Sequence, residues 1–219
     1  MKHTQLQDDG QMIYHGLLDS LEELDRLDEG LAAMRARHGN PPDRFTPATL
    51  STLIRIILGQ QISRAVAETL WQRLQQHKLS NSSELARATY EQLQELGLSR
   101  RKSEYIVDIA RAEQEGRLDL SALNRASAED FSAELIQYRG IGSWTISNYR
   151  LFCLGDFDAW PGNDLALMEA VRRLRALENR PTASMMDEIA QRWTPYRGAA
   201  ALLLWHLYAV WVRNARPLS

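Results

Sequence analysis

The segment Leu135–Leu167 reads LIQYRGIGSWTISNYRLFCLGDFDAWPGNDLAL, and the interpretation of the whole chain starts from it. It predicts a helix that ends at Tyr138, a tight turn around Gly140 and Gly142, and a second helix that is capped by Ser143. Two glycines one residue apart allow positive φ and a close approach of the backbone to a bulky partner. The N-terminus of the second helix would present N–H groups and a positive dipole end, which suit a phosphate.

The same segment continues into a loop and a third helix. Gly155 is expected to stop the second helix, a short loop crosses Pro161 and Gly162, and Asp164 stands where the next helix begins. An aspartate in this place is a common helix N-cap. It could equally be a functional carboxylate, and the pattern alone leaves both interpretations open.

Outside this segment the chain reads as all-α. No strand-type alternation persists, and apolar residues recur at three- and four-residue spacing. Residues 1–12 are expected to form a frayed tail. The helices are expected over 17–27, 28–37, from the Thr46-Pro47 pair to Gly59, 63–77, a short stretch from Ser82 or Ser83, 89–97, 100–115, 127–138, 143–154, 164–177, 182–193 and 197–212.

The composition excludes some classes of protein. The formal net charge is −2, which alone argues against nucleic-acid binding, but arginines gather after Val171 whereas the first thirty residues are acidic. A single cysteine, Cys153, excludes an internal disulfide and a cluster held by several cysteines, and it fits a reducing setting. No apolar run reaches membrane-span length and the N-terminus is polar, so we expect a cytoplasmic or nucleoid-associated protein that does not contact membranes.

Several segments together resemble one family. The 135–167 segment is similar to the helix-hairpin-helix and Gly-Pro-Asp loop of the DNA glycosylase superfamily of that name (HhH-GPD). Within it, the 3-methyladenine DNA glycosylase II branch, which excises alkylated bases, is the most similar. The likeness spans roughly residues 27–212 and includes the segments ILGQQIS (57–63), LGLSRRK (96–102), WTPYR (193–197) and LW (204–205).

The resemblance implies an all-α, two-lobed fold with the active-site cleft between the lobes. Residues 48–157 would form a central helical lobe that contains the hairpin. Residues 1–47 and 158–219 would form the second lobe.

The resemblance also implies that Asp164 is the catalytic carboxylate. Breaking an N-glycosidic bond builds positive charge on the sugar, and a carboxylate near the anomeric carbon stabilises that charge. The N-cap alternative stays open, and Asp156 and Asp158 are rival carboxylates in the preceding loop.

The resemblance places Trp144 at the position where lyase-type members carry a nucleophilic lysine, and no lysine occurs from Ser103 to Ser219. A monofunctional enzyme that uses water is therefore expected, with no cofactor required. The iron–sulfur cluster of some lyase relatives needs four cysteines, which this chain does not have.

Aromatic side chains would hold the flipped base. An alkylated purine is cationic, and an indole face attracts it by about 0.5–2 kcal/mol. The resemblance places Trp144 and Trp205 in the base pocket, with Tyr149 and Trp160 as further candidates. All except Trp144 could instead be core aromatics. The pocket tyrosine of one branch would fall at Asn148, so the preferred base is open.

DNA contacts are expected around the hairpin. Gln61 matches the position of the wedge side chain that fills the gap left by the flipped nucleotide, with a helix-end role as the alternative. Phosphate contacts are expected from Arg139, Gly140, Gly142, Ser143 and Thr145. The resemblance also implies a monovalent Na or K ion on hairpin carbonyls, which here would be those of Ile136, Tyr138 and Ile141.

Three departures from the family pattern leave alternatives. Arg139 replaces a proline, and Met168 and Glu169 replace an arginine pair. Glu169 is open to two roles, raising the pKa of Asp164 or altering the DNA contact. The main prediction is a monomeric, monofunctional glycosylase acting on damaged double-stranded DNA. The alternatives are a non-catalytic, structure-specific DNA-binding protein and a helical interaction protein.

Overall fold

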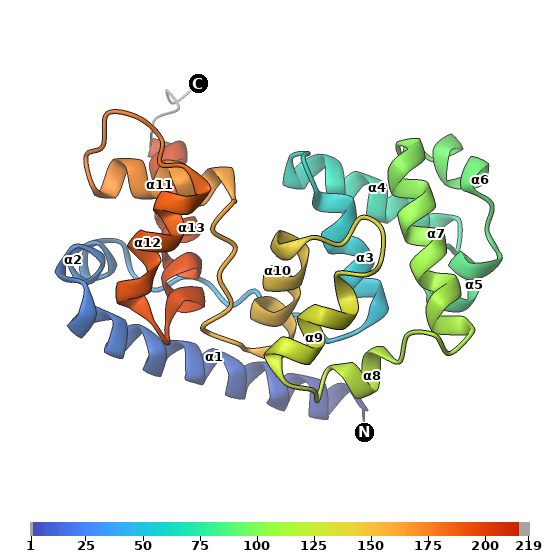
Figure 1. The fold of residues 1–219 in the computed structure, drawn as a ribbon, viewed down its shortest axis with the longest axis horizontal. Helices are drawn as coiled ribbons and strands as arrows, with labels where there is room; N and C mark the ends of the chain where they lie inside the picture. Colours follow the sequence, from blue (N-terminus) through green and yellow to red (C-terminus); the bar gives the residue numbers. More distant parts are fainter. Residues whose placement is uncertain (1, 215–219) are drawn as a thin grey trace. The chain divides into compact units, whose positions relative to one another are not determined.

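The computed structural model describes residues 2–214, with side chains over residues 11–213. Within these residues the chain forms helices and no strand, which confirms the all-α class (Figure 1). Close contacts divide it into a central unit, residues 47–149, and a terminal unit, residues 1–46 with 150–219. No helix in the described part has the length and apolar character of a membrane span.

The terminal unit is built around its last helix. Its elements are α1 (Lys2–Leu27), α2 (Glu29–His38), α11 (Leu165–Leu174), α12 (Ala183–Ala190), the 3-10 turn η1 (Gln191–Trp193) and α13 (Arg197–Asn214). Helix α13 packs against α1, α2 and α11 (Figure 1). The resulting core is lined by fully buried residues that include Leu21, Leu167, Trp193 and Leu203.

The expectation of a frayed tail over residues 1–12 was wrong, because α1 begins at Lys2. Its buried positions Leu17, Leu21 and Leu24 recur at helical spacing and anchor the helix in the core. Once such a helix is anchored, extending it by further residues is much cheaper than nucleating a new one.

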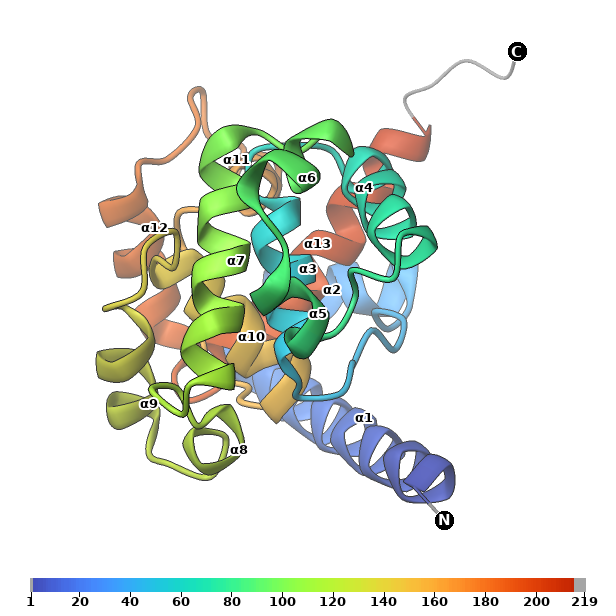
Figure 2. The same ribbon diagram turned by 90° about the vertical axis from the view of Figure 1, so that its right-hand side faces the viewer.

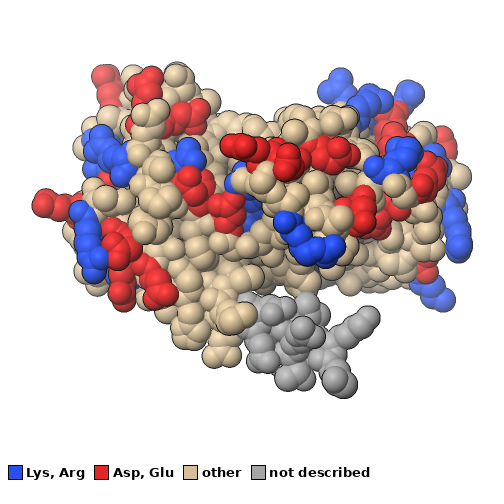
Figure 3. Space-filling view, turned by 60° about the horizontal axis from the view of Figure 1, so that its bottom comes forward, with Lys and Arg blue, Asp and Glu red and all other residues tan. Residues whose placement is uncertain are grey.

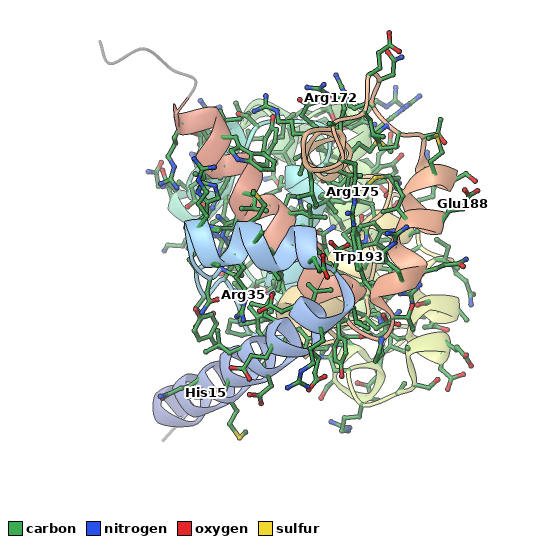
Figure 4. All side chains as sticks on the ribbon, turned by 90° about the vertical axis from the view of Figure 1, so that its left-hand side faces the viewer. His15, Arg35, Arg172, Arg175, Glu188 and Trp193 are labelled. Atoms are coloured by element: carbon green, nitrogen blue, oxygen red, sulfur yellow. The ribbon has the colours of Figure 1, made fainter. Side chains whose placement is uncertain are left out.

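A buried carboxylate ties the start of α2 to the rest of the terminal unit. Asp28 caps α2 by accepting the N–H groups of Gly30 and Leu31, each at 3.1 Å, and it is 5% exposed. Its carboxylate also accepts the indole N–H of Trp193 at 2.8 Å and pairs with Arg175. Figure 4 shows Arg175 and Trp193 close together beside α2. One side chain therefore joins three segments that are distant in the sequence.

The central unit contains the remaining helices and the beginning of α10. They are α3 (Leu50–Gly59), α4 (Arg64–Gln76), α5 (Ser82–Arg87), α6 (Tyr90–Glu95), α7 (Arg100–Gln114), α8 (Leu120–Leu123), α9 (Ala128–Leu135) and α10 (Ser143–Leu154). Helix α7 packs against α3, α5 and α6 (Figure 2). The hydroxyl caps predicted at Ser63, Thr89, Ser99 and Ser127 are confirmed, with a full capping box at Thr89.

Several helix ends differ from the predictions. Thr49 caps α3, so the Thr46-Pro47 pair lies before the helix. Helix α9 stops at Leu135 and not at Tyr138, which lengthens the joint between the hairpin helices, whereas α10 spans Ser143–Leu154 as expected. The four-residue helix α8 was not predicted, because it is too short to show a periodic pattern.

The boundary between the two units falls within α10, after Tyr149, whereas the resemblance predicted a division after Phe157. The second half of this helix contributes Leu151, fully buried, to the core of the terminal unit. A division set by packing therefore falls inside the helix and not in the loop that follows it.

Part of the surface charge is balanced locally. On the face seen in Figure 3, acidic and basic side chains are intermixed. Arg172, Arg173 and Arg180 of the arginine-rich segment all lie within 4 Å of Glu169, so part of the positive charge after Val171 is neutralised locally.

Candidate functional site

Asp164 is the N-cap of α11, and its carboxylate is held in one orientation. Oδ1 accepts the backbone N–H groups of Ala166 at 2.9 Å and Leu167 at 3.0 Å. The same oxygen accepts the indole N–H of Trp205, from α13, at 3.0 Å. An N-cap needs only the backbone contacts. The bond from Trp205 is an addition that fixes the carboxylate against a helix distant in the sequence.

The rival carboxylates are bound by arginines. Asp156 pairs with Arg150 and also accepts the N–H of Asp158 at 3.0 Å. Asp158 accepts two side-chain N–H groups of Arg197, at 2.8 and 2.6 Å. Hydrogen bonding to Asp158 raises the pKa of the Arg197 guanidinium. These two aspartates brace the loop between α10 and α11, which leaves Asp164 as the strongest candidate for chemistry.

The loop before Asp164 has little spare room. The Asp164 N–H donates to the Pro161 carbonyl at 3.0 Å and closes a turn. A Cβ on Gly162 would lie 2.4 Å from the Trp160 ring nitrogen and 2.6 Å from an Asp187 oxygen. Trp160 itself donates to Asp187 at 3.0 Å and packs edge-on against Trp193. Trp160 therefore shapes this loop from within the terminal unit.

Trp205 is half-buried and has an aromatic neighbour. Its ring stacks on Phe152 with centroids 5.6 Å apart and planes at 23°. Its indole N–H is directed to Asp164. The side chain is therefore held both by stacking and by the carboxylate that it orients.

Glu169 is turned toward arginines of its own segment. Its carboxylate accepts hydrogen bonds from Arg172 and Arg173, at 2.8 and 2.9 Å, and lies 3.7 Å from Arg180. The hydrogen bonds from Arg172 and Arg173 lower the pKa of Glu169 to about 2. Met168 packs against the core. Asn163, which directly precedes Asp164, is exposed.

In the central unit, the hairpin turn is shaped by Tyr105 of α7. Gly140 has φ +85°, and a Cβ there would lie 2.1 Å from the Tyr105 ring. The Arg139 guanidinium lies over the same Tyr105 ring, with its carbon 5.7 Å from the ring centroid. One of its nitrogens is 3.7 Å from a Glu104 carboxylate oxygen, and the Arg139 side chain is 71% exposed. Gly142 and Ser143 are exposed at the start of α10. This turn can present N–H groups and a guanidinium to an anion.

Other predicted site residues lie deeper in the central unit. Thr145 is 1% exposed, and its hydroxyl accepts a hydrogen bond from Gln60 at 2.8 Å, so this side chain lies beneath the turn. Tyr149 is fully buried and stacks on Phe131 at 5.6 Å, which favours the core alternative. Asn148 is 5% exposed and donates to the Trp144 carbonyl at 2.7 Å. Trp144 is half-buried on α10.

The predicted cation site involves backbone of the same turn. The Tyr138 carbonyl accepts the N–H of Ile141 at 3.1 Å. A carbonyl oxygen has two lone pairs, so this bond still allows Tyr138 to contact a cation. In the part of the chain that the structure describes, His, Cys, Asp and Glu side chains form no metal-binding group.

The loop between α3 and α4 contains the predicted wedge. Gln61 is exposed and has φ +58°, a left-handed conformation that is uncommon for residues other than glycine. The side chain of the adjacent Gln60 turns inward, and Lys102 donates to two carbonyls of this segment. Sequence reasoning missed Gln60 and Lys102, since nothing in their spacing marks them.

The two glycines of the turn provide a matched pair of substitutions. Gly140→Ala meets both a left-handed backbone and the Tyr105 ring, so we expect a loss of about 1–3 kcal/mol in the free energy of unfolding. Gly142→Ala meets no atom within 4 Å and has no left-handed φ, so it should change stability by less than about 0.5 kcal/mol. Denaturant unfolding of both variants measures this difference. Equal stability would show that Tyr105 does not constrain the turn.

Comparison with known proteins agrees with this geometry. The family model described as "HhH-GPD superfamily base excision DNA repair protein" matches residues 54–196, more than half of the chain. The chain therefore belongs to the HhH-GPD superfamily. The matched range contains the α3–α4 loop, the hairpin and Asp164.

Its relatives include 3-methyladenine DNA glycosylases. YfjP of Bacillus subtilis (strain 168), whose name assigns this activity without establishing it, is 31% identical over 185 residues, 80% of this chain and 64% of that protein. The DNA-3-methyladenine glycosylase of the same strain is 30% identical over 164 residues, 69% of this chain and 54% of its own length. The chain thus spans less than two thirds of either relative.

A solved structure supports the fold directly. The 3-methyladenine DNA glycosylase Mag1 of Schizosaccharomyces pombe, in complex with abasic DNA, superposes with a TM-score of 0.79. The sequences are 27% identical, and the match covers 85% of this chain and 95% of Mag1. The predicted helix-hairpin-helix glycosylase fold is confirmed.

Proposed function

We propose that this protein is a monofunctional DNA glycosylase that removes alkylated bases, of the 3-methyladenine type, from duplex DNA during base excision repair. The observation that supports this most is the position of Asp164. Asp164 lies in the stretch matched by the superfamily, and its carboxylate is fixed by two backbone N–H groups and by the Trp205 indole. Such an enzyme would act inside the cell, where its substrate is.

The chemistry would use a carboxylate that does not move during the reaction. As the base leaves, the sugar gains oxocarbenium character, and a carboxylate already in place stabilises that charge without reorganisation. Asp164 would also orient or deprotonate the attacking water. The N-cap bonds and the Trp205 bond would hold the carboxylate for this purpose, so capping and catalysis are compatible in one side chain.

Base and DNA contacts are assigned as part of the same proposal. Trp205 and Trp144 would stack on the flipped cationic base. The hairpin turn would contact phosphate through Arg139, Gly140, Gly142 and Ser143. Gln61 would fill the gap that the flipped nucleotide leaves in the duplex. A monovalent cation on the carbonyls of Ile136, Tyr138 and Ile141 would add positive charge to this turn.

Lyase chemistry would need an amine, and the chain offers few. Its lysines are Lys2, Lys78 and Lys102. The Lys102 ammonium donates to the carbonyls of Leu58 at 2.6 Å and Gln60 at 2.7 Å, which holds it in a structural role. Trp144 occupies the place of the lyase lysine. These features support hydrolysis by water.

Borohydride trapping tests this mechanism class. We expect no covalent protein–DNA adduct when the enzyme turns over a cleavable substrate with borohydride present, because the Lys102 ammonium is engaged by two backbone carbonyls and Trp144 would stand in the place of the lysine that forms the Schiff base. Electrophoresis after incubation measures the adduct, with a lyase-type glycosylase as positive control. An adduct formed in proportion to product would show that another amine serves as nucleophile.

One assay separates the proposed function from its alternatives. Methylated duplex DNA is incubated with the protein, and abasic sites are then revealed by alkaline scission. Scission at methylated purines supports the glycosylase. Salt-sensitive binding without scission would support the non-catalytic DNA-binding protein, and neither result would support a helical interaction protein.

A further inference from the structure

The Gln60 side chain connects the α3–α4 loop to the hairpin turn. Its Nε2 donates to the Gly140 carbonyl and to the Thr145 hydroxyl, each at 2.8 Å. A backbone carbonyl can only accept, so the amide nitrogen must face this side. Both contacts lie about eighty residues away in the chain. One amide group therefore spans the gap between two segments of the central unit.

Lys102 contacts the backbone of the same residue. It lies near the N-terminus of α7, and its ammonium donates to the carbonyls of Leu58 and Gln60, at 2.6 and 2.7 Å. These carbonyls belong to the C-terminal end of α3, where a cation is favoured by the helix dipole. Burial lowers the pKa of Lys102. The backbone of Gln60 is thus fixed by Lys102 while its side chain is fixed by the hairpin.

Gln61 follows directly and is held in an uncommon conformation. Gln60 itself is extended, with φ −60° and ψ 127°, and Gln61 then takes φ +58°. A left-handed conformation is sterically disfavoured for residues other than glycine and persists only where the surroundings enforce it. After Gln61 the chain enters α4, which Ser63 caps. The fixed Gln60 on one side and the capped helix on the other constrain the backbone of Gln61 and so the direction in which its exposed side chain leaves the loop.

We infer that Gln60 is a positioning residue that holds the Gln61 wedge at a fixed place relative to the phosphate-binding turn of the hairpin. The inference rests on the proposed function, because it assigns DNA roles to both segments. Contact of the turn with a phosphate would then set where the wedge meets the duplex. Without the link, the turn would still bind phosphate, but the wedge would lose its register with the nucleotide to be flipped.

The chemistry of the link explains why glutamine is needed at position 60. A glutamate would place a carboxylate against the Gly140 carbonyl and would lose both donors. An asparagine is one methylene shorter and would not reach both acceptors. Gln60→Ala removes both hydrogen bonds and leaves the Gly140 turn, its Tyr105 contact and the Lys102 bonds to the backbone in place.

The test measures wedge insertion separately from excision. The full-length protein is mixed with a duplex that carries a tetrahydrofuran abasic analogue opposite 2-aminopurine, whose fluorescence rises when the stack beside it is disturbed. Single-turnover excision is measured in parallel on duplex containing 7-methylguanine. For Gln60→Ala we expect the fluorescence change to fall to less than about half, the excision rate to fall about tenfold, which is about 1.4 kcal/mol, and affinity for undamaged duplex to stay within about threefold.

A double-mutant cycle shows whether the effect passes through the wedge. Gln61→Ala should lower fluorescence change and rate to a similar extent, and the double variant should be no worse than either single variant, because both remove one function. Additive losses would overturn the inference and mean that Gln60 acts independently of Gln61. Gln72→Ala is the matched control, since Gln72 is exposed on α4 and makes one long bond within its own helix.

One further variant distinguishes loss of the link from a general loss of structure. Thr145→Val is isosteric and removes one of the two acceptors, so it should give a smaller defect of the same kind. If Gln60→Ala does not fold, this variant carries the test, and a wild-type fluorescence change would overturn the inference. A wild-type protein that excises bases while Gln60→Ala and Thr145→Val show normal fluorescence would refute the link and leave the proposed function intact. Absence of excision by the wild-type protein would instead refute the proposed function, and the inference with it.

Discussion

Asp164→Asn is expected to slow base release by at least about a hundredfold, a loss of about 2.7 kcal/mol in transition-state stabilisation. Asparagine keeps the carbonyl-type oxygen that accepts the N–H groups of Ala166, Leu167 and Trp205. It removes the negative charge that would face the developing oxocarbenium ion. Single-turnover excision from methylated duplex measures the loss, and DNA affinity should stay within a few-fold of wild type.

Trp205→Phe is the companion variant. It keeps an aromatic ring that can stack on Phe152 but removes the N–H that donates to Asp164. The carboxylate then keeps its charge and its two backbone bonds, so the loss in rate should lie between wild type and Asp164→Asn. If Asp164→Asn excises bases at nearly the wild-type rate, Asp164 is a helix cap and the catalytic assignment is wrong.

Asp28→Ala is expected to destabilise the fold by about 3–5 kcal/mol, the cost of breaking a buried ion pair by removing one partner. The substitution leaves Arg175 and the Trp193 indole without their acceptor and removes the cap of α2. Denaturant unfolding measures the change. Glu23→Ala is the control, because Glu23 pairs with Arg26 on the surface and should contribute about 0–1 kcal/mol.

The pH dependence of this effect has a definite sign. Burial alone would raise the pKa of Asp28, but hydrogen bonds from Trp193 and Leu31 and the charge of Arg175 outweigh it and leave the pKa below its ordinary value of 3.8. A carboxyl whose pKa is lower in the folded state stabilises the fold above its unfolded pKa, and that stabilisation is lost as the pH falls through the folded value. The difference between wild type and Asp28→Ala should therefore be full above about pH 5 and shrink below about pH 4. A difference that stays constant down to pH 2 would show that the charge of Asp28 is not what stabilises this region.

Local signals made much of the fold predictable. Hydroxyl caps at Ser63, Ser99 and Ser127 act on N–H groups three residues away, so the sequence window that contains the cap also contains its partner. The two glycines of the hairpin and the Asp164 cap are equally local. Ends without such a signal, such as the start of α1 and the end of α9, were placed wrongly because packing and helix extension set them.

The site was less predictable because its contacts join distant segments. Trp205 lies forty-one residues after the aspartate that it orients, and Gln60 reaches Thr145 across eighty-five. Thr145 illustrates the consequence. Its place at the start of α10 suggested a surface hydroxyl, but it lies beneath the turn, and its partner is Gln60 from the loop between α3 and α4. Spacing along a chain does not encode such pairs.

The most direct measurement is the identification of small molecules released from methylated duplex DNA by the wild-type protein. Chromatography with mass detection should find free 3-methyladenine and 7-methylguanine at rates well above the protein-free control, with the DNA strand intact until alkali is added. Asp164→Asn should bind the same DNA and release almost none. No free base above the control, from wild-type protein that binds the duplex, would contradict the assignment of this chain as a glycosylase.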